Sequence, residues 1–374
     1  MKIVISGGHL TPALAFIEHI KSNHESDEIV FIGRLFSKKN EQQVSQEKTE
    51  VEKLGVKFIP FNSVKLSKNT VVAKLRSIPV LLFRIIATTS ILAKEKPDVF
   101  VSFGGYLAVP ITIAAWIMRV PIVTHEQTRT AGVANTIIAK FANKIAISYP
   151  ESKENFPKSR TYLTGNLIRQ SVLKNNKTLP NWIKKKPSKP ILYITGGSQG
   201  SEIINRTVSL ILKPLLKNWF IIHQCGKPTN TTNYAKELQI IKNQLSLANQ
   251  ETYQIREWVS EAELAWIYSN AKGIISRAGA NTTEEIALGG IPAILIPLPF
   301  SHNDEQLKNA QALSNNKQAI LLEQKNLTPE VLLEATQLMQ KYHRKFSRNL
   351  QLFSKTEDSE QKLYELVQSV VQKK

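Results

Sequence analysis

The hydrophobic pattern of the chain alternates between two kinds of segment. Short apolar runs, typical of buried strands, are separated by longer amphipathic stretches such as residues 12–22. An alternation of strands and helices predicts a parallel sheet covered by helices on both faces. In the first half of the chain, strands are predicted at Lys2–Ser6, Glu28–Ile32, Val56–Pro60, Asp98–Phe103, Pro121–His125 and Lys144–Ser148.

A second series of strands and helices follows a break in this pattern. The break, residues 165–190, is polar, rich in lysine and interrupted by three prolines, which is typical of an interdomain linker. A chain of 374 residues also exceeds the size of one ordinary core, so two domains are expected. In the second half, strands are predicted at Ile191–Thr195, Trp219–His223, Ala271–Ser276, Ala293–Pro297 and Gln318–Leu322.

The sequence therefore predicts an α/β protein with two domains of one plan, each built from strands, glycine-rich turns and helices. We place the first domain at residues 1–164, the linker at 165–190 and the second domain at 191–345. The tail after Leu327 has helical periodicity and contains no glycine, and we assign its last part, residues 346–374, to a separate C-terminal segment. We expect a final helix there that could pack back on the first domain.

The charge of the chain favours an acidic partner. Its formal value is +19, from 49 Lys and Arg against 30 Asp and Glu. Nucleic acid, an anionic membrane surface and a phosphorylated substrate all fit, and the alternative for any one cluster is a solvated lysine-rich surface. Cys225 is the single cysteine, which excludes an intrachain disulfide and fits a reducing cytoplasm. The longest apolar stretches contain Arg84 and Arg119 and fall short of the roughly 20 apolar residues that span a bilayer.

Three glycine-rich turns follow predicted strands, at the edge of a parallel sheet where ligands bind. Glycine allows backbone N–H groups to approach a ligand closely, and the helix that follows adds the positive end of its dipole. Each turn could be only a tight connection, but three in one chain favour a diphosphate-containing nucleotide. They are Gly7-Gly8-His9, Gly196-Gly197-Ser198-Gln199-Gly200 and Arg277-Ala278-Gly279-Ala280 with the residues up to Glu285.

Motif searches exclude two common kinds of nucleotide site. The chain has neither a G-x-G-x-x-G run nor a Walker G-x-x-x-x-G-K-[ST] run, which counts against dehydrogenases and P-loop kinases. Its four aspartates form no Asp-x-Asp pair, the usual magnesium clamp of a sugar nucleotide, so we expect no metal cofactor. Helix ends and cationic side chains would then stabilise a departing diphosphate.

Several polar residues beside these turns are candidates for chemistry. His9 is the best candidate for a general base, because it stands in the first turn and an imidazole has a near-neutral pKa. Glu126, at the end of a predicted strand, is the second candidate. Glu285, about one turn inside a predicted helix, could accept both hydroxyls of a ribose. The polar segment 302–309 suits sugar hydroxyls. For each of these residues the alternative is a structural or solvated role.

The stretch from Lys65 to Lys96 combines basic residues with many apolar ones. This composition fits an element that dips apolar side chains into lipid while its basic residues meet acidic headgroups. The alternative is a helix buried against its own sheet. Pro79 is expected to kink or divide the segment.

Seven motifs, well separated along the chain, together form a specific series. They are Gly7-Gly8-His9 with Pro12-Ala13-Leu14-Ala15, Lys96-Pro97-Asp98-Val99 leading to Phe103-Gly104-Gly105-Tyr106, His125-Glu126-Gln127, Gly165-Asn166 with Arg169, Gly196-Gly197-Ser198-Gln199-Gly200, Arg277-Ala278-Gly279-Ala280 through Glu285-Ile286-Ala287, and Gln306 with Asn309-Ala310. In this order, over essentially the whole chain, the series resembles the MurG family, the bacterial UDP-GlcNAc:undecaprenyl-diphospho-muramoylpentapeptide β-N-acetylglucosaminyltransferases.

The resemblance implies a fold and an activity. The fold would be two Rossmann-like domains facing a cleft, the GT-B glycosyltransferase architecture. The activity would be that of an inverting hexosyltransferase in peptidoglycan synthesis, which adds GlcNAc to lipid I to give lipid II. Such an enzyme would be peripheral, at the cytoplasmic face of the cell membrane.

The resemblance also assigns roles to residues. The second domain would hold the donor substrate UDP-GlcNAc, with its ribose on Glu285, its uracil against Val259 and its GlcNAc hydroxyls on Gln306. Arg169 would reach the donor from across the cleft. The turns expected to hold the diphosphate contribute Ser198, Gln199, Ala280, Asn281 and Thr282.

The first domain would hold the undecaprenyl-diphosphate-linked acceptor, with its diphosphate near Gly7, Gly8 and His9. Two departures from the family concern this site. The first turn usually reads G-G-T-G-G-H, of which only Gly7-Gly8-His9 remains. Thr128, also expected at the acceptor, stands where the family has the asparagine of H-E-Q-N. The threonine keeps a hydroxyl but loses the amide.

Other functions stay open at this level. Among enzymes they are another GT-B glycosyltransferase acting on a glycolipid and a UDP-sugar epimerase. The non-enzyme alternative is a basic nucleic-acid-binding protein, although binding a phosphate backbone does not need three glycine-rich turns. The partners we expect are UDP-GlcNAc, the lipid-linked acceptor and, through residues 65–96, an anionic membrane surface, with no nucleic acid.

Overall fold

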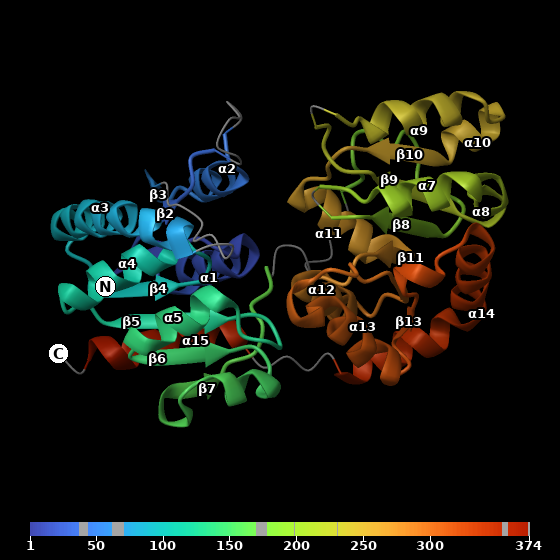
Figure 1. The fold of residues 1–374 in the computed structure, drawn as a ribbon. Helices are drawn as coiled ribbons and strands as arrows, with labels where there is room; N and C mark the ends of the chain where they lie inside the picture. The colour runs from blue at the N-terminus through green and yellow to red at the C-terminus, as the bar shows by residue number, and fades with distance from the viewer. Residues whose placement is uncertain are drawn as a thin grey trace. The chain divides into compact units, whose positions relative to one another are not determined.

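The computed structural model describes residues 1–36, 44–61, 71–169, 178–197, 199–229, 231–353 and 358–372. The chain divides into two compact units, each with its own sheet (Figure 1). The first unit comprises Met1–Arg169 and Glu357–Lys374, and the second comprises Gln170–Thr356.

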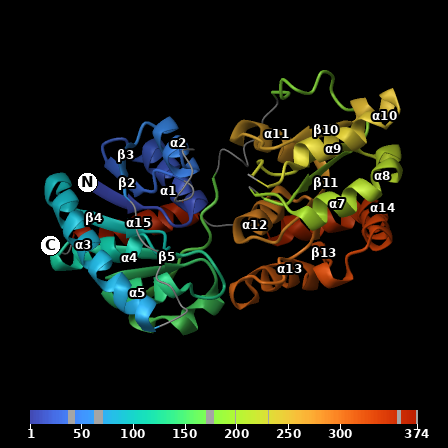
Figure 2. The ribbon, with the colours of Figure 1, turned by 45° about the horizontal axis from the view of Figure 1, so that its top comes forward.

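The first unit contains a seven-stranded parallel sheet in the order β3-β2-β1-β4-β5-β6-β7. Its central strands read as continuous apolar runs because both faces are covered by helices, as Figure 2 shows. The elements are β1 (Lys2–Ser6), α1 (Leu10–Asn23), β2 (Glu28–Gly33), α2 (Gln46–Lys53), β3 (Lys57–Pro60), α3 (Val71–Glu95), β4 (Val99–Ser102), α4 (Ala108–Ile117), β5 (Ile122–Glu126), α5 (Val133–Phe141), β6 (Lys144–Ile147), η1 (Pro150–Asn155), η2 (Lys158–Arg160), β7 (Thr161–Leu163) and α15 (Ser359–Val371).

The second unit contains a six-stranded parallel sheet in the order β10-β9-β8-β11-β12-β13. One face packs against α11, α12 and α13, and the other against α7, α8 and α14. The elements are β8 (Ile191–Thr195), α7 (Glu202–Leu210), α8 (Leu212–Asn218), β9 (Phe220–Gln224), α9 (Tyr234–Asn243), α10 (Leu247–Glu251), β10 (Tyr253–Arg256), α11 (Glu261–Asn270), β11 (Ala271–Ser276), α12 (Ala280–Gly289), β12 (Ala293–Leu295), η3 (His302–Asp304), α13 (Glu305–Asn315), β13 (Ala319–Leu321), η4 (Gln324–Asn326) and α14 (Pro329–Phe353).

The strand order reverses once in each sheet, beside the first strand of that unit. β1 lies between β2 and β4, and β8 lies between β9 and β11. Connections leave the carboxyl ends of the two strands at such a point in opposite directions, which opens a crevice where ligands of α/β proteins bind. The fold therefore offers one ligand-binding edge in each unit.

Every strand predicted from the sequence is present, with bounds shifted by up to two residues. The sequence missed β7 and β10, both short strands at an edge of their sheets. Tyr162 and Leu163 of β7 are exposed, and Gln254 and Arg256 alternate with apolar residues in β10. Neither strand shows an apolar run, because an edge strand needs less burial than a central one.

The tail of the chain forms two helices that belong to different units. α14 continues past residues 345 and 346, where the sequence analysis divided the second domain from the tail, and packs on the second sheet. α15 packs against α1 and against β4, β5 and β6 of the first unit. Its Leu363 and Val367 are fully buried there, and Tyr364 donates a hydrogen bond of 2.7 Å to Asp27. The Glu360 carboxylate accepts a 2.8 Å bond from the backbone N–H of Ile168.

α3 is a single helix that continues through Pro79, so the expected division of this segment is not found. The proline removes one helical hydrogen bond, and the packing of α3 against α4 provides compensating contacts. Residues 65–70, the start of the basic and apolar stretch, lie outside the described residues. Among the described helices, none is both long and apolar enough to cross a membrane.

Candidate functional site

Two glycine-rich turns of the first unit meet at its ligand-binding edge. Gly7-Gly8-His9 follows β1, and the turn that contains Gly104 and Gly105 follows β4. The backbone N–H of His9 donates to the carbonyl of Phe103 at 3.2 Å. A Cβ on Gly8 would lie 2.0 Å from the carbonyl oxygen of Gly104, so only glycine allows this contact. Gly104 and Gly105 both have φ of +76°, which strains any other residue.

His9 stands immediately before α1, and its imidazole makes no capping hydrogen bond. Burial lowers its pKa, and the negative charge of Glu126 offsets part of this effect. The folded protein therefore favours the neutral imidazole at pH 7, which is the form that accepts a proton. The general-base role of His9 stays a prediction, and a neutral imidazole is the form that this role requires.

The Glu126 carboxylate, at the end of β5, is held by four hydrogen bonds. One oxygen accepts from the backbone N–H of Thr128 at 3.0 Å and from its hydroxyl at 2.7 Å. The other accepts from the Gly132 N–H at 3.0 Å and the Asn135 amide at 2.9 Å. These donors fill the acceptor positions of a carboxylate. Glu126 is thus better suited to shaping this loop and stabilising a protonated His9 than to accepting a proton itself.

Thr128 is the residue that replaces the family's asparagine. Its hydroxyl lies 2.7 Å from Glu126 and 2.5 Å from the carbonyl of Thr130. The side chain is buried, and both of these oxygens compete for its single hydroxyl proton, which is therefore directed inside the protein. The acceptor contact predicted for Thr128 therefore has less support from the geometry than that of His9.

In the second unit, the turn after β8 packs directly on the end of β9. A Cβ on Gly200 would lie 2.0 Å from the carbonyl oxygen of Cys225, and Gly200 has a φ of +74°. The Gly197 N–H donates to the Thr195 hydroxyl at 3.0 Å, and Gln199 is exposed on the turn. Ser198, expected to contact the diphosphate, lies outside the described residues.

The third turn leads into the N-terminus of α12. Gly279 is the N-cap and has no side chain to cap the helix, so the first backbone N–H groups of α12 are available to an anion. These groups belong to Ala280, Asn281 and Thr282, the predicted diphosphate contacts. The Asn281 side-chain oxygen is buried without a hydrogen-bond partner in the described structure.

Arg277 connects this turn to its neighbours, a role that the sequence did not reveal. Its guanidinium donates to the Ser201 hydroxyl at 2.8 Å, to the Gln324 amide oxygen at 2.9 Å and to the carbonyl of Ile296 at 3.1 Å. These partners are neutral and do not cancel the positive charge of the guanidinium, which therefore acts between the two turns. Within the described ranges, no three His, Cys, Asp or Glu side chains form a group that could hold a metal ion.

The remaining predicted donor residues lie around these turns. Glu285 is buried on α12, Val259 is buried just before α11, and Gln306 is the second residue of α13. The Gln306 side chain accepts from the Leu298 N–H at 3.0 Å and so fixes the loop after β12. Arg169 belongs to the first unit, whereas the other predicted donor residues belong to the second. The fold of either unit alone therefore does not place Arg169 beside those residues.

Trp258 is a further candidate that sequence reasoning missed. It precedes Val259, is half-buried, and has the Lys227 ammonium 5.4 Å from its ring centre. An aromatic face beside a cation is suited to a planar ligand such as a nucleobase. In the sequence, Trp258 and Val259 follow closely after a strand, a position typical of ligand-binding residues. Because β10 was not predicted, this position was not recognised.

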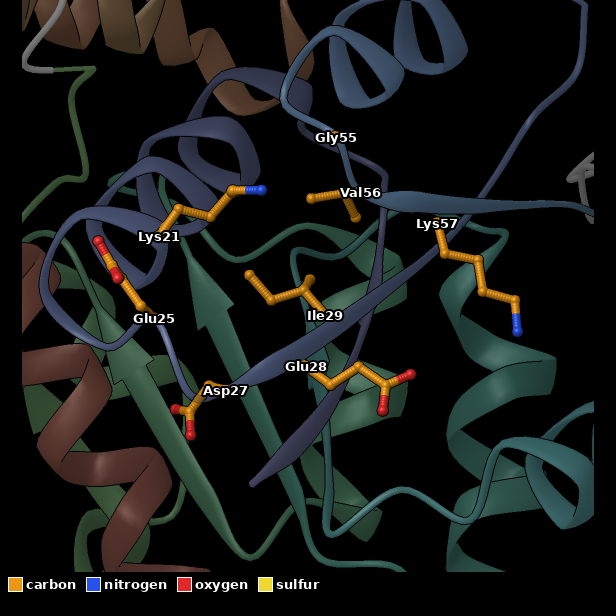
Figure 3. Close-up of a pocket in the computed structure, with 8 residues that line it drawn as sticks. All are labelled: Lys21, Glu25, Asp27, Glu28, Ile29, Gly55, Val56 and Lys57. Atoms are coloured by element: carbon orange, nitrogen blue, oxygen red, sulfur yellow. The ribbon is translucent and has the colours of Figure 1, made fainter.

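A pocket of about 500 Å³ lies at the opposite edge of the first sheet (Figure 3). Ile29 and Val56 lie between Lys21 on one side and Lys57 on the other. Several of its lining residues lie at the N-terminal ends of β2 and β3, whereas the glycine-rich turns follow the C-terminal ends of strands. It is therefore separate from the candidate site.

Two parallel sheets in two units, each with a glycine-rich edge, define a class by their fold, the two-domain GT-B architecture. Two structures of this class overlay on almost the whole chain. A crystal structure of Acinetobacter baumannii MurG has a TM-score of 0.70 at 23% identity, covering 98% of this chain and 99% of that one. The UDP-GlcNAc 2-epimerase from Neisseria meningitidis, bound to UDP-GlcNAc, has a TM-score of 0.69 at 13% identity, covering 99% of this chain and 100% of that one. The fold is thus shared by transferases and epimerases.

Sequence similarity places the chain more narrowly. Models of the glycosyltransferase family 28 N-terminal and C-terminal domains match residues 6–147 and 191–368. The UDP-N-acetylglucosamine–N-acetylmuramyl-(pentapeptide) pyrophosphoryl-undecaprenol N-acetylglucosamine transferase 2 of Bacillus cereus is 34% identical, over 89% of this chain and 90% of its own length. The chain belongs to glycosyltransferase family 28 and, within it, to the MurG family, which confirms the resemblance seen in the motifs.

One prediction concerns His125, which is fully buried behind the Glu126 loop. Its Nε2 lies 3.3 Å from both the Gly165 carbonyl and the Ser148 hydroxyl, and burial lowers its pKa to about 4. An unfolded histidine is protonated below a pH of about 6.5, so folding stability is lost as the pH falls from there toward 4. We expect urea denaturation to show a larger loss of stability between pH 7 and pH 5 in the wild type than in His125→Gln. Below pH 6.5, each further pH unit should cost up to about 1.4 kcal/mol for this group. Equal losses of stability in the two proteins would contradict the assignment of this pH dependence to His125.

Proposed function

We infer that this protein transfers GlcNAc from UDP-GlcNAc to the lipid-linked muramoyl-pentapeptide, converting lipid I to lipid II in peptidoglycan synthesis. The observation that carries this conclusion is the match to relatives named for that reaction over nearly their full length. The glycine-rich edge of each unit supports it, since backbone N–H groups at such an edge suit an anion, and both the donor and the acceptor of this reaction contain a diphosphate.

The second unit is the proposed donor site. The N-terminus of α12 and the charge of Arg277 would stabilise the diphosphate, with Ser198, Gln199 and Arg169 as further contacts. Glu285 would bind the ribose, Gln306 the GlcNAc hydroxyls, and Val259 would lie against the uracil. Helix N–H groups and a guanidinium are fixed before the reaction, so they stabilise developing negative charge without reorganising.

The first unit is the proposed acceptor site, with the acceptor diphosphate at Gly7 and Gly8. The acceptor 4-hydroxyl attacks the anomeric carbon from the face opposite UDP, so one C–O bond forms as the other breaks and the configuration inverts. His9 takes the hydroxyl proton, and the electron pair of the broken bond leaves with UDP. Glu126 would stabilise the imidazolium that results.

The alternatives predict different products. An epimerase would convert UDP-GlcNAc without any acceptor, and a transferase for another glycolipid would not use a lipid I analogue. A nucleic-acid-binding protein would retain DNA on a filter at physiological salt. Family membership favours the lipid I transferase over these alternatives.

The assay that tests the proposal is incubation with UDP-GlcNAc and a lipid I analogue, with and without EDTA. We expect a GlcNAc-containing product and release of UDP in both cases, because the proposed diphosphate contacts are helix ends and Arg277. UDP-GlcNAc without the acceptor is the control. Loss of activity on chelation, with recovery on adding magnesium or manganese, would contradict a metal-independent site. Conversion of the donor without an acceptor would favour an epimerase.

A second prediction tests His9 as the general base. We expect His9→Ala to lower kcat by about 10²- to 10⁴-fold while leaving the affinity for UDP, bound in the other unit, nearly unchanged. Because burial lowers the pKa of His9, the acidic limb of the wild-type rate profile should lie below pH 6.5. His9→Asn, which can donate hydrogen bonds but cannot take the proton, should not restore the rate. An acidic limb that persists in both variants would identify another group as the base.

We further propose that the enzyme is a peripheral protein of the cytoplasmic face of the cell membrane, attached through α3 and α4. These two helices pack together, and each carries large apolar side chains on its outer face. Leu82, Phe83 and Ile86 of α3 and Trp116 and Ile117 of α4 are each more than half exposed. Such side chains fit an element that enters the lipid interface.

Basic residues accompany this apolar surface. Lys94, Lys96, Arg119 and Lys140, on or next to α3, α4 and α5, are all exposed. Their charge would attract acidic headgroups over a distance of about a Debye length. The other face of α3 is buried, with Leu92 in the core, so the helix combines the two roles that the sequence left open.

A third prediction follows for vesicle binding. We expect salt-sensitive binding to vesicles with anionic lipid and little binding to neutral ones. Replacing Leu82, Phe83 and Ile86 with serine should weaken binding, while Leu247→Ser, which removes an exposed leucine of the second unit, should not. Equal binding to both kinds of vesicle, or unchanged binding of the triple variant, would contradict this attachment.

A further inference from the structure

The carboxylate of Glu285 is held by a tyrosine from a neighbouring helix. The hydroxyl of Tyr268, on α11, donates a buried hydrogen bond of 3.0 Å to the Oε2 atom of Glu285, on α12. Glu285 is 6% exposed and Tyr268 is 7% exposed. The two residues lie 17 positions apart, so this contact exists only because α11 and α12 pack on the same face of the second sheet.

Tyr268 is in turn fixed by the sheet. Its ring meets that of Tyr193 edge to face, with ring centres 6.3 Å apart and planes at 73°. Tyr193 is fully buried on β8, and its hydroxyl donates to the Gln224 side chain on β9 at 2.5 Å. The position of the Tyr268 hydroxyl is therefore set by two strands of the core, which is a more rigid support than a surface loop.

A hydrogen bond at this place controls the orientation of the carboxylate. The last torsion of a glutamate is broad, so a carboxylate that is not held turns easily about its own axis. A donor fixed on one oxygen selects one plane for the group. A carboxylate has about four acceptor positions on its two oxygens, and the Tyr268 hydroxyl occupies one of them, on Oε2.

We propose that Tyr268 is a positioning residue, which holds the plane of the Glu285 carboxylate for the two hydroxyls of a ribose. This inference rests on the proposed function, in which Glu285 binds the ribose of UDP-GlcNAc. It adds that selection of a ribonucleotide depends on a residue that does not itself touch the donor. Preorganisation of this kind increases affinity by removing an ordering cost from the bound state.

The test is the affinity for UDP measured by calorimetry in Tyr268→Phe, which removes the hydroxyl and keeps the ring. We expect UDP to bind about three- to tenfold more weakly, the effect of a single hydrogen bond. The KM for UDP-GlcNAc should rise by a similar factor with kcat within about twofold. Tyr253→Phe is the matched control, because it removes a buried tyrosine hydroxyl of the same unit that bonds to His223 and not to Glu285. It should leave the affinity unchanged.

A second ligand separates positioning from a merely structural role. For 2′,3′-dideoxy-UDP, which lacks the ribose hydroxyls, Tyr268→Phe should change the affinity by less than twofold. Equal weakening of both ligands would show that the tyrosine only supports the fold of the site. An unchanged affinity for UDP in Tyr268→Phe would also overturn the proposal.

The Glu285→Ala variant distinguishes failure of this inference from failure of the ribose assignment. We expect it to weaken UDP binding by about tenfold or more, the effect of a hydrogen bond to a charged group. In that background, Tyr268→Phe should have no additional effect, because its role passes through the carboxylate. Additive losses would overturn the positioning role. If Glu285→Ala binds UDP as the wild type does, the ribose assignment fails, and the role of Tyr268 with it.

Discussion

The candidate sites of both units depend on direct contact between backbone segments at the carboxyl edge of a parallel sheet. In the first unit Gly8 lies against the carbonyl of Gly104, and in the second Gly200 lies against that of Cys225. A Cβ at either glycine would be 2.0 Å from an oxygen, far inside contact distance. This approach brings two turns and the start of a helix to one place, where backbone N–H groups can converge on an anion.

Hydrogen bonds orient the two buried carboxylates that flank these turns. Hydroxyl and amide groups hold Glu126 in the first unit, and the Tyr268 hydroxyl holds Glu285 in the second. Neutral donors satisfy the oxygens of a carboxylate without cancelling its charge. Glu126 can therefore still raise the pKa of His9. The Glu126 carboxylate is thus held in place by hydrogen bonds and still acts on the charge of His9.

The fold by itself leaves the reaction open, because a UDP-GlcNAc 2-epimerase overlays on the chain about as well as a MurG structure does. What separates the two is the residues placed on the fold. A transferase needs a second binding site for its acceptor, and the first unit has both a glycine-rich edge and an exposed apolar surface on α3 and α4. These features agree with an acceptor that is both anionic and lipid-linked.

The sequence by itself determined the two-unit α/β plan, the central strands and the family. These properties follow from local patterns: apolar runs for buried strands, and glycines where backbone must meet backbone or ligand. The edge strands β7 and β10 were missed because short edge strands need no apolar run. Only the tertiary structure decided that α15 joins the first unit, that Arg277 links two turns, and that Tyr268 reaches Glu285. Each of these depends on contacts between residues distant along the chain, which no local pattern records.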